Sequence, residues 1–434
     1  MKVNELQNVD GFIKSNLELS PEVYLRLTID SRKIDGFSAF LALKGERFDG
    51  HDFISKAIDL GVTNVILDRA DVYEEVINTY PQVAFILVED SLKYLQESSK
   101  YKIEKFKSRG GKVFALTGSN GKTTNKEMMS FIATKLLSGG VASTRGNFNN
   151  HIGVPLTIHQ EINNETKFAI IEMGTSFPGE IEFLAELVNP HFGYITNIGL
   201  AHIEFLKSQE GIFEEKTALY RNIKKNKGTF FVNTSDEFLK RLSNEQYCID
   251  CKNMNVEHQT ILESYNLENL NMMAFIACEI FGQNEKVLKI ASEFQMPKMN
   301  RSEWINVGSK ELFLDAYNAN PSSMEKAVVE FSKQKPLNDS IYILGDMNEL
   351  GEFAKSEHNR IAKLLNSLGV KDAIFIGRYA ELYDEAFAGT SHKYDSMEEF
   401  NQHAPEVLNS FRYIFLKASR SLQFEKILDI KDRL

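Results

Sequence analysis

Short apolar runs alternate with amphipathic stretches along most of the chain. In the first hundred residues, the runs AFLAL, NVILD and AFILVED indicate β-strands separated by helical stretches. From residue 112 to about residue 300, the runs KVFALTG, FAIIEMG, GYITNIG and TFFVN recur with helical patterns between them. Such alternation is typical of a mostly parallel sheet with helices on both faces. The pattern therefore predicts an α/β fold.

The alternation restarts after about residue 300, with LFLDAYN, IYILGD, DAIFIG and YIFLKAS. One of the intervening stretches, residues 356–368, places apolar side chains on one side of a helix and is followed by Gly369, which suits a helix C-cap. The apolar positions of this predicted helix are Ile361, Leu364, Leu365 and Leu368. A second sheet with covering helices is therefore expected in this part of the chain.

We predict three domains. Residues 1–108 would form a small mixed α/β domain, residues 109–300 a P-loop-type domain with a mostly parallel sheet, and residues 301–434 a Rossmann-like α/β domain. A prior of about 150 residues per domain agrees with this division of a 434-residue chain. The basic, glycine-tipped segment KYKIEKFKSRGGK, residues 100–112, is expected to be a linker into the second domain.

A glycine-rich turn lies between an apolar run and a helical pattern in ALTGSNGKTTNKEMMSF, residues 115–131. Glycine lets a ligand approach the backbone, a lysine supplies positive charge, and threonine hydroxyls can face a metal ion. A strand, such a turn and a helix N-terminus together form a phosphate cradle. Leu116 stands where the standard P-loop has its first glycine, which leaves the shorter G-x-x-G-K-T-T. The alternative is an ordinary strand-to-helix turn with an exposed lysine. The predicted phosphate-binding residues are Gly118, Ser119, Asn120, Gly121, Lys122, Thr123 and Thr124.

Polar residues follow several other predicted strands. Glu172 ends the run FAIIEMG, and His202 follows GYITNI, so both are expected near Lys122 at the carboxyl ends of the strands. A carboxylate there can hold a magnesium ion bound to nucleotide phosphates, although a surface charge is the alternative for Glu172 and a structural role for His202. Lys216, in FEEKTALY, has the pattern of a solvated helix residue.

The segment RGNFNNHIGVP is rich in amide side chains in a loop that Pro155 is expected to close. Amides both donate and accept hydrogen bonds, which suits a polar substrate, but asparagine also favours plain turns. The candidate substrate-binding residues of this loop are Asn147, Asn149 and Asn150.

Composition narrows the function classes. With 43% hydrophobic and 25% charged residues the chain is expected to be globular, and a net charge of −10 argues against nucleic-acid binding through bulk positive charge. The N-terminus lacks a signal-peptide pattern and no stretch reaches 18 apolar residues, so we expect a cytoplasmic protein without a membrane span. Cys248 and Cys251 form a C-x-x-C without a second pair, and Cys278 lies in an apolar stretch, so no disulfide framework or zinc site is expected.

Seven motifs then point to a family. TGSNGKTTNKE, GNFNNHIGVP, IEMGTSFPGEI, AHIEFLKSQEGIFEEKTALY, DAYNANPSSMEKAV, GDMNELG and LKASRS occur in this order and together resemble the Mur ligases of peptidoglycan synthesis. The resemblance begins near residue 28 and is most specific over residues 117–217 and 315–351. It implies an ATP-dependent amide ligase with an acyl-phosphate intermediate and two Mg²⁺ ions. We also expect a monomer. The motifs are most similar to those of members that join D-alanyl-D-alanine to UDP-N-acetylmuramoyl-tripeptide.

The resemblance also implies roles for individual residues. Lys122 and Thr123 would hold the ATP phosphates and the first magnesium, with Glu172 and His202 as further metal ligands. Lys216 falls where the family carries a lysine modified by carbon dioxide; carbamylation would turn this cation into an anion that can ligate a second magnesium. The motifs DSR and GERFDGHDF resemble the family's uridine nucleotide site. The implied contacts there are Ser31, Arg47, Asp49, Gly50 and His51.

Further implied residues lie toward the C-terminus. Asn266 and Asn269 match an asparagine pair near the adenine, and Tyr265 stands where the family usually has histidine. Arg301 and Asp315 match groups that the C-terminal domain brings to the nucleotide, and Arg301 joins Lys122, Lys216 and His202 among the implied catalytic residues. The residues implied near the incoming amine are Asn318, Asn320, Lys417, Ser419 and Arg420.

Three alternatives stay open. The chain could be another ligase of the same superfamily, either the enzyme that adds the third peptide residue or folylpolyglutamate synthetase, but DAYNANPSSM and GDMNELG favour the dipeptide-adding members. From a different class, it could be a P-loop nucleotide switch. The absence of an Asn-Lys-x-Asp motif and the glutamate in place of the usual aspartate at Glu172 disfavour a switch.

Overall fold

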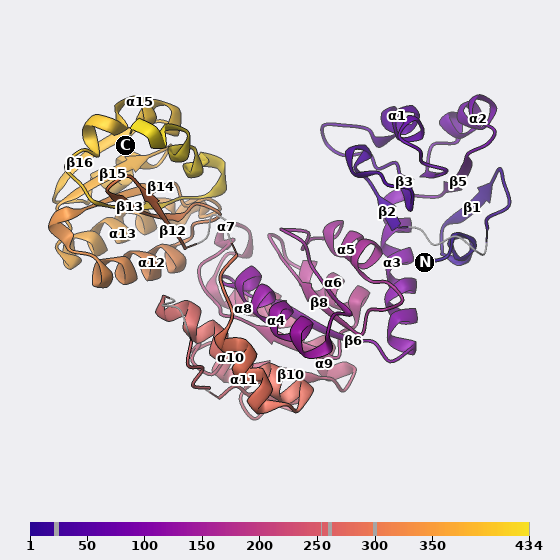
Figure 1. The fold of residues 1–434 in the computed structure, drawn as a ribbon, viewed down its shortest axis with the longest axis horizontal. Helices are drawn as coiled ribbons and strands as arrows, with labels where there is room; N and C mark the ends of the chain where they lie inside the picture. Colours follow the sequence, from indigo (N-terminus) through magenta and orange to yellow (C-terminus); the bar gives the residue numbers. More distant parts are fainter. Residues whose placement is uncertain (21–25, 253, 259–262, 298–301, 434) are drawn as a thin grey trace.

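A computed structural model describes residues 1–20, 26–252, 254–258, 263–297 and 302–433. Three sheets, each covered by helices, form three α/β domains, and the central domain lies between the other two (Figure 1). The predicted three-domain α/β architecture is therefore confirmed. The boundaries drawn after residues 108 and 300 stay predictions. Within the described ranges, no helix has the length and apolar character needed to cross a membrane.

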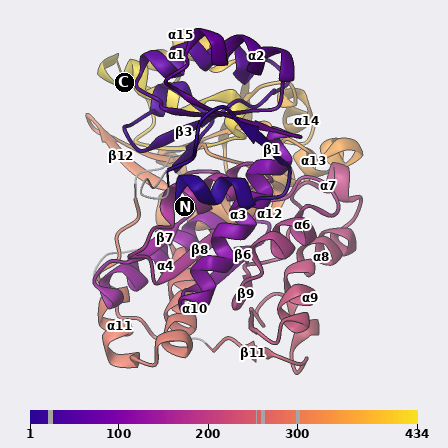
Figure 2. The same ribbon diagram turned by 90° about the vertical axis from the view of Figure 1, so that its right-hand side faces the viewer.

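The N-terminal sheet has the strand order β1-β5-β4-β3-β2. β1 runs antiparallel to β5, and the other pairs are parallel. Helices α1 and α2 pack on one face of the sheet, and α3 packs on the other, toward the central domain (Figure 2). The runs AFLAL, NVILD and AFILVED correspond to β3, β4 and β5, as predicted. The elements are β1 (Phe12–Ser15), β2 (Arg26–Thr28), β3 (Ser38–Leu41), α1 (Ile54–Asp59), β4 (Asn64–Leu67), α2 (Ala70–Thr79), β5 (Ala84–Val88) and α3 (Ser91–Ser108).

The segment 100–112 is not a linker, so that prediction is wrong. Most of it belongs to α3, which continues to Ser108 before the chain turns into the next strand. Ile103 and Phe106 are buried in the apolar cluster of the central domain. Their three-residue spacing places them on one face of the helix, and Glu104 and Lys105 between them are exposed. The high charge of the segment therefore reflects a half-buried helix that joins two domains.

A polar group is buried where α3 packs on α5 (Gly153–Glu161). Lys102 Nζ donates a hydrogen bond to the carbonyl oxygen of His159 at 2.8 Å, and the His159 ring lies 2.9 Å from Ser98 Oγ. Lys102 is only 9% exposed. Burial is the main cause that lowers the pKa of Lys102 to about 7, and the nearby charges of Arg109 and Arg26 lower it further.

Lys102→Met is expected to flatten the dependence of stability on pH. Between pH 7 and the ordinary lysine value of 10.5, the unfolded chain binds a proton at Lys102 that the folded chain does not. Wild-type stability should therefore rise with pH in this window by up to about 1.4 kcal/mol per unit, and methionine removes that contribution. Urea unfolding at pH 7 and pH 9 gives the free energy of unfolding at each pH, and the difference between the two values measures this dependence. The exposed Lys100→Met on the same helix is the control; equal slopes for Lys102→Met and wild type would contradict the prediction.

The central sheet is entirely parallel, with the order β11-β10-β9-β6-β8-β7. Helices α4, α10 and α11 pack on one face, and α3, α5, α6, α8 and α9 on the other. β6 lies where the strand order changes direction, which is where α/β sheets bind ligands. The elements are β6 (Lys112–Thr117), α4 (Lys122–Leu137), β7 (Val141–Ser143), β8 (Phe168–Glu172), α6 (Glu180–Val188), β9 (Phe192–Ile195), α7 (Ile203–Leu206), α8 (Gln209–Lys216), α9 (Ala218–Lys225), β10 (Thr229–Val232), β11 (Cys248–Asp250), α10 (Ser264–Phe281) and α11 (Asn284–Ser292).

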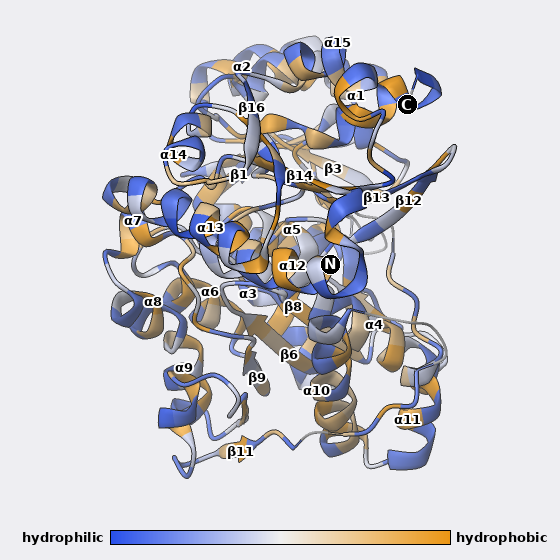
Figure 3. Cartoon of the chain, turned by 90° about the vertical axis from the view of Figure 1, so that its left-hand side faces the viewer, coloured by the Kyte–Doolittle hydropathy of each residue, from blue (hydrophilic) through white to orange (hydrophobic). Residues whose placement is uncertain are grey.

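The C-terminal sheet has the order β12-β13-β17-β14-β15-β16, and only β12 is antiparallel to its neighbour. Helices α12 and α13 lie on the side toward the central domain, with hydrophobic and hydrophilic residues on each (Figure 3). The predicted helix is α13, which ends at Leu368 and is followed by Gly369 as its C-cap, as expected. The elements are β12 (Glu303–Val307), β13 (Lys310–Asp315), α12 (Pro321–Gln334), β14 (Ser340–Gly345), α13 (Ala354–Leu368), β15 (Asp372–Ile376), α14 (Ala380–Asp384), β16 (Thr390–Tyr394), α15 (Met397–Val407) and β17 (Tyr413–Lys417).

One apolar cluster is shared by the central and C-terminal domains. Ile203 and Leu206 of α7 belong to it, and so do Ala319 and Leu350 from the C-terminal domain. α7 also packs against the short 3-10 helix η6 (Gly351–Phe353). The carboxyl end of the central sheet therefore faces the C-terminal domain across a packed contact.

Candidate active site

The loop between β6 and α4 requires glycine at both of its bracketing positions. Gly118 has φ +147°, and a Cβ there would lie 1.8 Å from Thr196 Oγ1. Gly121, the residue before α4, has φ +75°. No other residue type adopts both conformations without strain. The short G-x-x-G-K-T-T therefore builds a tight loop that leads directly into a helix N-terminus.

Lys122 folds back over this loop. Its Nζ donates hydrogen bonds to the carbonyl oxygens of Gly118 at 2.7 Å and Ser119 at 3.3 Å. The ammonium is thereby held close to the N-terminus of α4, where backbone N–H groups and the helix dipole already favour an anion. The arrangement suits a phosphate group.

Glu172 ends β8, directly beside the loop. It is 1% exposed, and its Oε1 accepts hydrogen bonds from Asn149 Nδ2 at 2.9 Å and Thr123 Oγ1 at 3.2 Å. Its buried Oε2 has no hydrogen-bond partner among the residues that the structure describes. Burying an unpaired carboxylate oxygen is costly unless a cation or donor satisfies it. The pair formed by Glu172 and Thr123 therefore fits a bound magnesium ion.

Lys216, at the end of α8, is completely buried. Its Nζ has no hydrogen-bond partner in the described part of the chain. The interpretation of Lys216 as a solvated helix residue, made from its local pattern, is therefore wrong. Burial is the main cause that lowers the pKa of Lys216 well below its usual range, and the charge of Lys122 adds to it, while Glu215 opposes it. The neutral amine that results can react with carbon dioxide, whereas an ammonium cannot.

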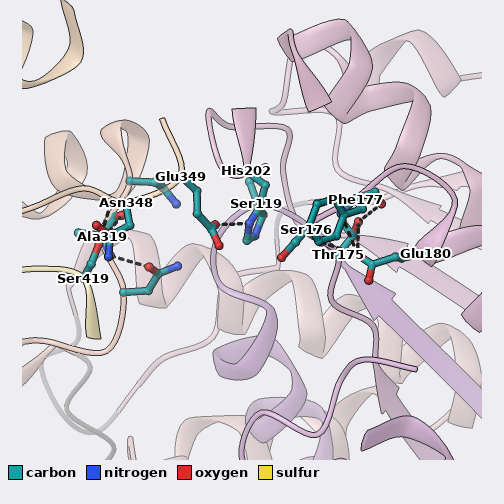
Figure 4. A network of polar contacts seen from close by, with 12 residues as sticks. Ser119, Thr175, Ser176, Phe177, Glu180, His202, Ala319, Asn348, Glu349 and Ser419 are labelled. Carbon is teal, nitrogen blue, oxygen red and sulfur yellow. Dashed lines mark hydrogen bonds and ion pairs between the residues drawn. The ribbon is translucent and has the colours of Figure 1, made fainter. Parts of the chain in front are cut away.

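The loop after β8 is fixed by two glutamates that the sequence analysis missed. Glu215 accepts hydrogen bonds from the backbone N–H groups of Gly179 at 2.6 Å and Ile181 at 2.8 Å. Glu180 accepts from the N–H groups of Ser176 at 2.6 Å and Phe177 at 2.8 Å (Figure 4). The sequence held a signal for Glu180, which is an acidic residue at the start of α6, because carboxylates favour helix N-termini.

A cavity of about 940 Å³ lies between the central and C-terminal domains. It brings together predicted residues from the loop, the neighbouring strand ends, α10 and the C-terminal domain. Those that line it are Ser119, Asn120, Gly121, Lys122, Thr123, Thr124, Asn147, Asn149, Asn150, Glu172, His202, Asn266, Asn269, Asp315, Asn318 and Lys417. Thr175, Ser176, Glu180, Asp236, Tyr265, Tyr317 and Lys326 also line it, without having been predicted. Gly118 and Lys216 are not among the lining residues.

On the C-terminal side, Lys417 and Asp315 are register neighbours on β17 and β13 and form an ion pair. Lys417 is 1% exposed, and its Nζ also donates to the carbonyl oxygen of Asn318 at 3.1 Å. An aligned carboxylate and ammonium thus lie at the cavity edge. Their mutual pairing sets the orientation of both groups.

Three other residues predicted near the amine do not line the cavity. Asn320 caps α12 through the backbone N–H of Ser323, at 3.0 Å, and donates from Nδ2 to Asn120 Oδ1 at 2.6 Å. The Ser419 hydroxyl bonds to the protein backbone, and Arg420 pairs with Glu425 at 2.7 Å. Arg301 lies outside the described residues.

Three family models together match most of the chain. The model described as "Mur ligase family, catalytic domain" matches residues 24–102, "Mur ligase middle domain" residues 116–295, and "Mur ligase, glutamate ligase domain" residues 300–420. A UDP-N-acetylmuramoyl-tripeptide–D-alanyl-D-alanine ligase of Bacillus subtilis is 31% identical, over 98% of this chain and 97% of its own. The chain belongs to the Mur ligase family. The family predicted from the seven motifs is confirmed.

Further relatives of this Mur ligase cover almost its whole length. A ligase of the same name from Rickettsia prowazekii is 29% identical, over 96% of this chain and 97% of its own. The crystal structure of MurF from Acinetobacter baumannii has a TM-score of 0.85 and 26% identity, over 99% of this chain and 98% of that one. The structure of MurF from Thermotoga maritima in complex with ADP has a TM-score of 0.77 at 23% identity, over 94% and 97%, and shares the fold.

Five residues of the N-terminal domain were expected at the site for the uridine nucleotide. They lie outside the cavity between the central and C-terminal domains. Asp49 accepts hydrogen bonds from the His51 backbone N–H at 3.0 Å and from its ring Nδ1 at 2.6 Å, and His51 Nε2 lies 3.1 Å from Asp68 Oδ1. Burial opposes protonation of His51, but the Asp68 and Asp49 carboxylates outweigh it and raise its pKa. Both ring nitrogens thus lie close to a carboxylate, so His51 braces the loop. The other expected residues of this group are Ser31, Arg47 and Gly50.

The C-x-x-C pair does not form a reactive dithiol. Cys248 and Cys251 are free thiols. Burial raises the pKa of Cys248 to about 12, and it also raises the pKa of Cys251. Thiols of this kind stay protonated at neutral pH and are poor metal ligands and nucleophiles.

Proposed function

We propose that this chain is an ATP-dependent ligase that joins D-alanyl-D-alanine to UDP-N-acetylmuramoyl-tripeptide in peptidoglycan precursor synthesis. The observation that carries the proposal is the alignment of the chain, over almost its whole length, with relatives that bear this activity in their names. The P-loop geometry at Lys122 and the unsatisfied oxygen of Glu172 supply the chemistry that such an activity needs.

The reaction poses a leaving-group problem, because a carboxylate does not condense with an amine at neutral pH. ATP supplies a γ-phosphoryl group that converts the carboxylate into an acyl phosphate, with ADP as the first product. The amine then attacks the acyl carbon, phosphate leaves, and the amide forms. Lys122 holds positive charge where two anionic reactants must approach each other. The two domains that line the cavity position the amine and limit the access of water.

The metal-binding part of the proposal involves Thr123, Glu172, His202 and a carbamylated Lys216. In the described ranges, no group of three or more His, Cys, Asp or Glu side chains is arranged to hold a metal. The site would therefore draw on a hydroxyl, a modified lysine and the nucleotide's own oxygens. The unsatisfied Glu172 Oε2 and the buried amine of Lys216 support this composition. We include two Mg²⁺ ions, which when bound would stabilise the charge that develops on the transferred phosphoryl group.

The remaining residue roles carry over from the motif matches. We propose that Asn266 and Asn269 contact the adenine, that Asp315 contacts the nucleotide, and that Asn318 and Lys417 face the incoming amine. All five line the cavity, which supports these roles. A cytoplasmic location and a monomeric state complete the proposal.

The proposal is tested by incubating the purified protein with UDP-N-acetylmuramoyl-tripeptide, D-alanyl-D-alanine, ATP and MgCl₂. Mass spectrometry should show the pentapeptide product, and phosphate release should require both the tripeptide and the dipeptide. Three control reactions test the alternatives. The first replaces D-alanyl-D-alanine with L-alanyl-L-alanine. The second offers a free diamino acid together with the UDP-linked dipeptide precursor, and the third offers a folate together with glutamate. Ligation in one of these reactions, with none to D-alanyl-D-alanine, would contradict the proposal.

A further inference from the structure

His202 lies at the junction between the central and C-terminal domains. It directly precedes α7, has a left-handed backbone with φ +58°, and lines the large cavity. Its Nδ1 lies directly against Oε2 of Glu349, a residue of the C-terminal domain (Figure 4). The backbone oxygen of Glu349 also accepts a hydrogen bond from the N–H of Glu204 at 3.1 Å. The two domains therefore meet at His202 through both a side chain and the backbone.

The loop that carries Glu349 is held rigidly. Glu349 itself has φ +61°, a conformation that is strained for a side chain other than glycine. The preceding Asn348 N–H donates to Ser419 Oγ at 3.0 Å, and the Ser419 N–H donates to the backbone oxygen of Asp346 at 3.0 Å. Ser419 therefore ties the loop after β14 to the end of β17. The hydrogen bonds through Ser419 hold Glu349 in its strained backbone conformation, and strain that is kept in this way points to a functional position.

The same loop approaches α7 closely. Gly351 has φ +52°, and a Cβ at this position would lie 3.0 Å from Glu204 Cγ. A second contact joins the C-terminal domain to the nucleotide loop, since Asn320 Nδ2 donates to Asn120 Oδ1 at 2.6 Å. The C-terminal domain thus contacts both the phosphate cradle and the segment around α7. The contact at His202 is the one that places a carboxylate of the C-terminal domain against an imidazole of the central domain.

A carboxylate against Nδ1 has a defined effect on an imidazole. It fixes the tautomer in which Nδ1 carries the hydrogen, orients the ring, and leaves Nε2 as the atom with a free lone pair. That lone pair is what a metal or a phosphate-bound cation needs. Removing such a carboxylate partner typically weakens metal binding about 10- to 100-fold.

We propose that Glu349 is a positioning residue, brought in by the C-terminal domain, that holds His202 in the tautomer and orientation needed to bind the metal–nucleotide complex. This inference rests on the proposed function, because it requires a metal–nucleotide site at His202. If Glu349 has this role, the metal–nucleotide site is complete only when the C-terminal domain contacts the central domain. The ligand is the Mg²⁺ complex of a nucleoside triphosphate.

The experiment compares Glu349→Ala and Glu349→Gln with wild type and with Glu352→Ala. Glu352 is exposed on η6, close to Glu349, and so controls for the loss of a carboxylate from this region. The first measurement is the affinity for Mn²⁺ together with a non-hydrolysable ATP analogue, by calorimetry. We expect Glu349→Ala to weaken binding about 10- to 100-fold. Glu349→Gln should lose less, because its amide oxygen can still accept from Nδ1, and Glu352→Ala should bind like wild type.

The second measurement is ¹⁵N NMR of histidine-labelled protein without nucleotide, with His202 assigned through His202→Gln. Wild type should show one tautomer with the hydrogen on Nδ1, and Glu349→Ala a mixture. A purely structural role for Glu349 would leave this signal unchanged. Unaltered tautomer and affinity in Glu349→Ala, with normal binding by wild type, would overturn this inference alone. A wild-type protein that binds no metal–nucleotide would overturn the proposed function as well.

Discussion

Lys122→Ala is expected to abolish ATP-dependent phosphate release while the protein stays folded. The Lys122 ammonium is held over the loop by the carbonyl oxygens of Gly118 and Ser119. In the proposed reaction it would supply charge at the point where two anions must meet. Preorganised contacts of this type contribute about 10²- to 10³-fold to the rate. Because the side chain is only partly buried and its amine bonds to carbonyl oxygens of the loop, its removal should leave the core of α4 intact. Phosphate release with both substrates present, and thermal unfolding, measure the two effects.

The matched control is Lys135→Ala, in the last turn of the same helix. Its amine is 2.9 Å from Glu293 at the protein surface, so its loss should change neither activity nor folding appreciably. Full phosphate release by Lys122→Ala would refute the assignment of the loop to ATP. Equal loss of activity in both variants would instead indicate a general effect on α4.

The sequence predicted those parts of the fold in which local pattern and burial agree. The runs that became β3 to β6, β8 to β10, β13 to β15 and β17 are apolar stretches whose side chains are mostly buried. β16 was missed because TSHKY is polar and largely exposed at the sheet edge. Pro155 was expected to close a loop but lies in the first turn of α5, a position where proline needs no hydrogen-bond donor.

Contacts between domains were beyond the reach of local pattern. Asn320 and Ser419 matched family positions near the amine, but their side chains are engaged by Asn120 and by the loop of Glu349. These interactions join residues that are far apart in the chain, so neither periodicity nor spacing encodes them.

The burial of Lys216 was also beyond the reach of local pattern. Its neighbours in FEEKTALY are those of an exposed helix, and only the packed structure shows that Lys216 is completely buried.

Lys216→Ala is expected to lower ligase activity by about 10²-fold or more, with partial recovery on addition of acetate or another short-chain carboxylic acid. A buried amine whose pKa is lowered by burial is neutral enough to accept carbon dioxide, and the carbamate that forms carries the negative charge that a metal site needs. Alanine removes this group and leaves space in which a small carboxylate can take its place. Activity with and without acetate, at fixed ionic strength, measures the recovery.

Lys216→Met is the variant that decides between this chemistry and simple packing. Methionine has nearly the volume of the lysine side chain and suits a fully buried position, so the protein should fold and stay inactive. It also fills the space, and acetate should therefore rescue Lys216→Ala but not Lys216→Met. Wild-type activity should fall in buffers depleted of carbon dioxide and return with bicarbonate. If neither acetate nor bicarbonate has any effect, Lys216 acts as an amine, and its charge reversal by carbamylation is excluded.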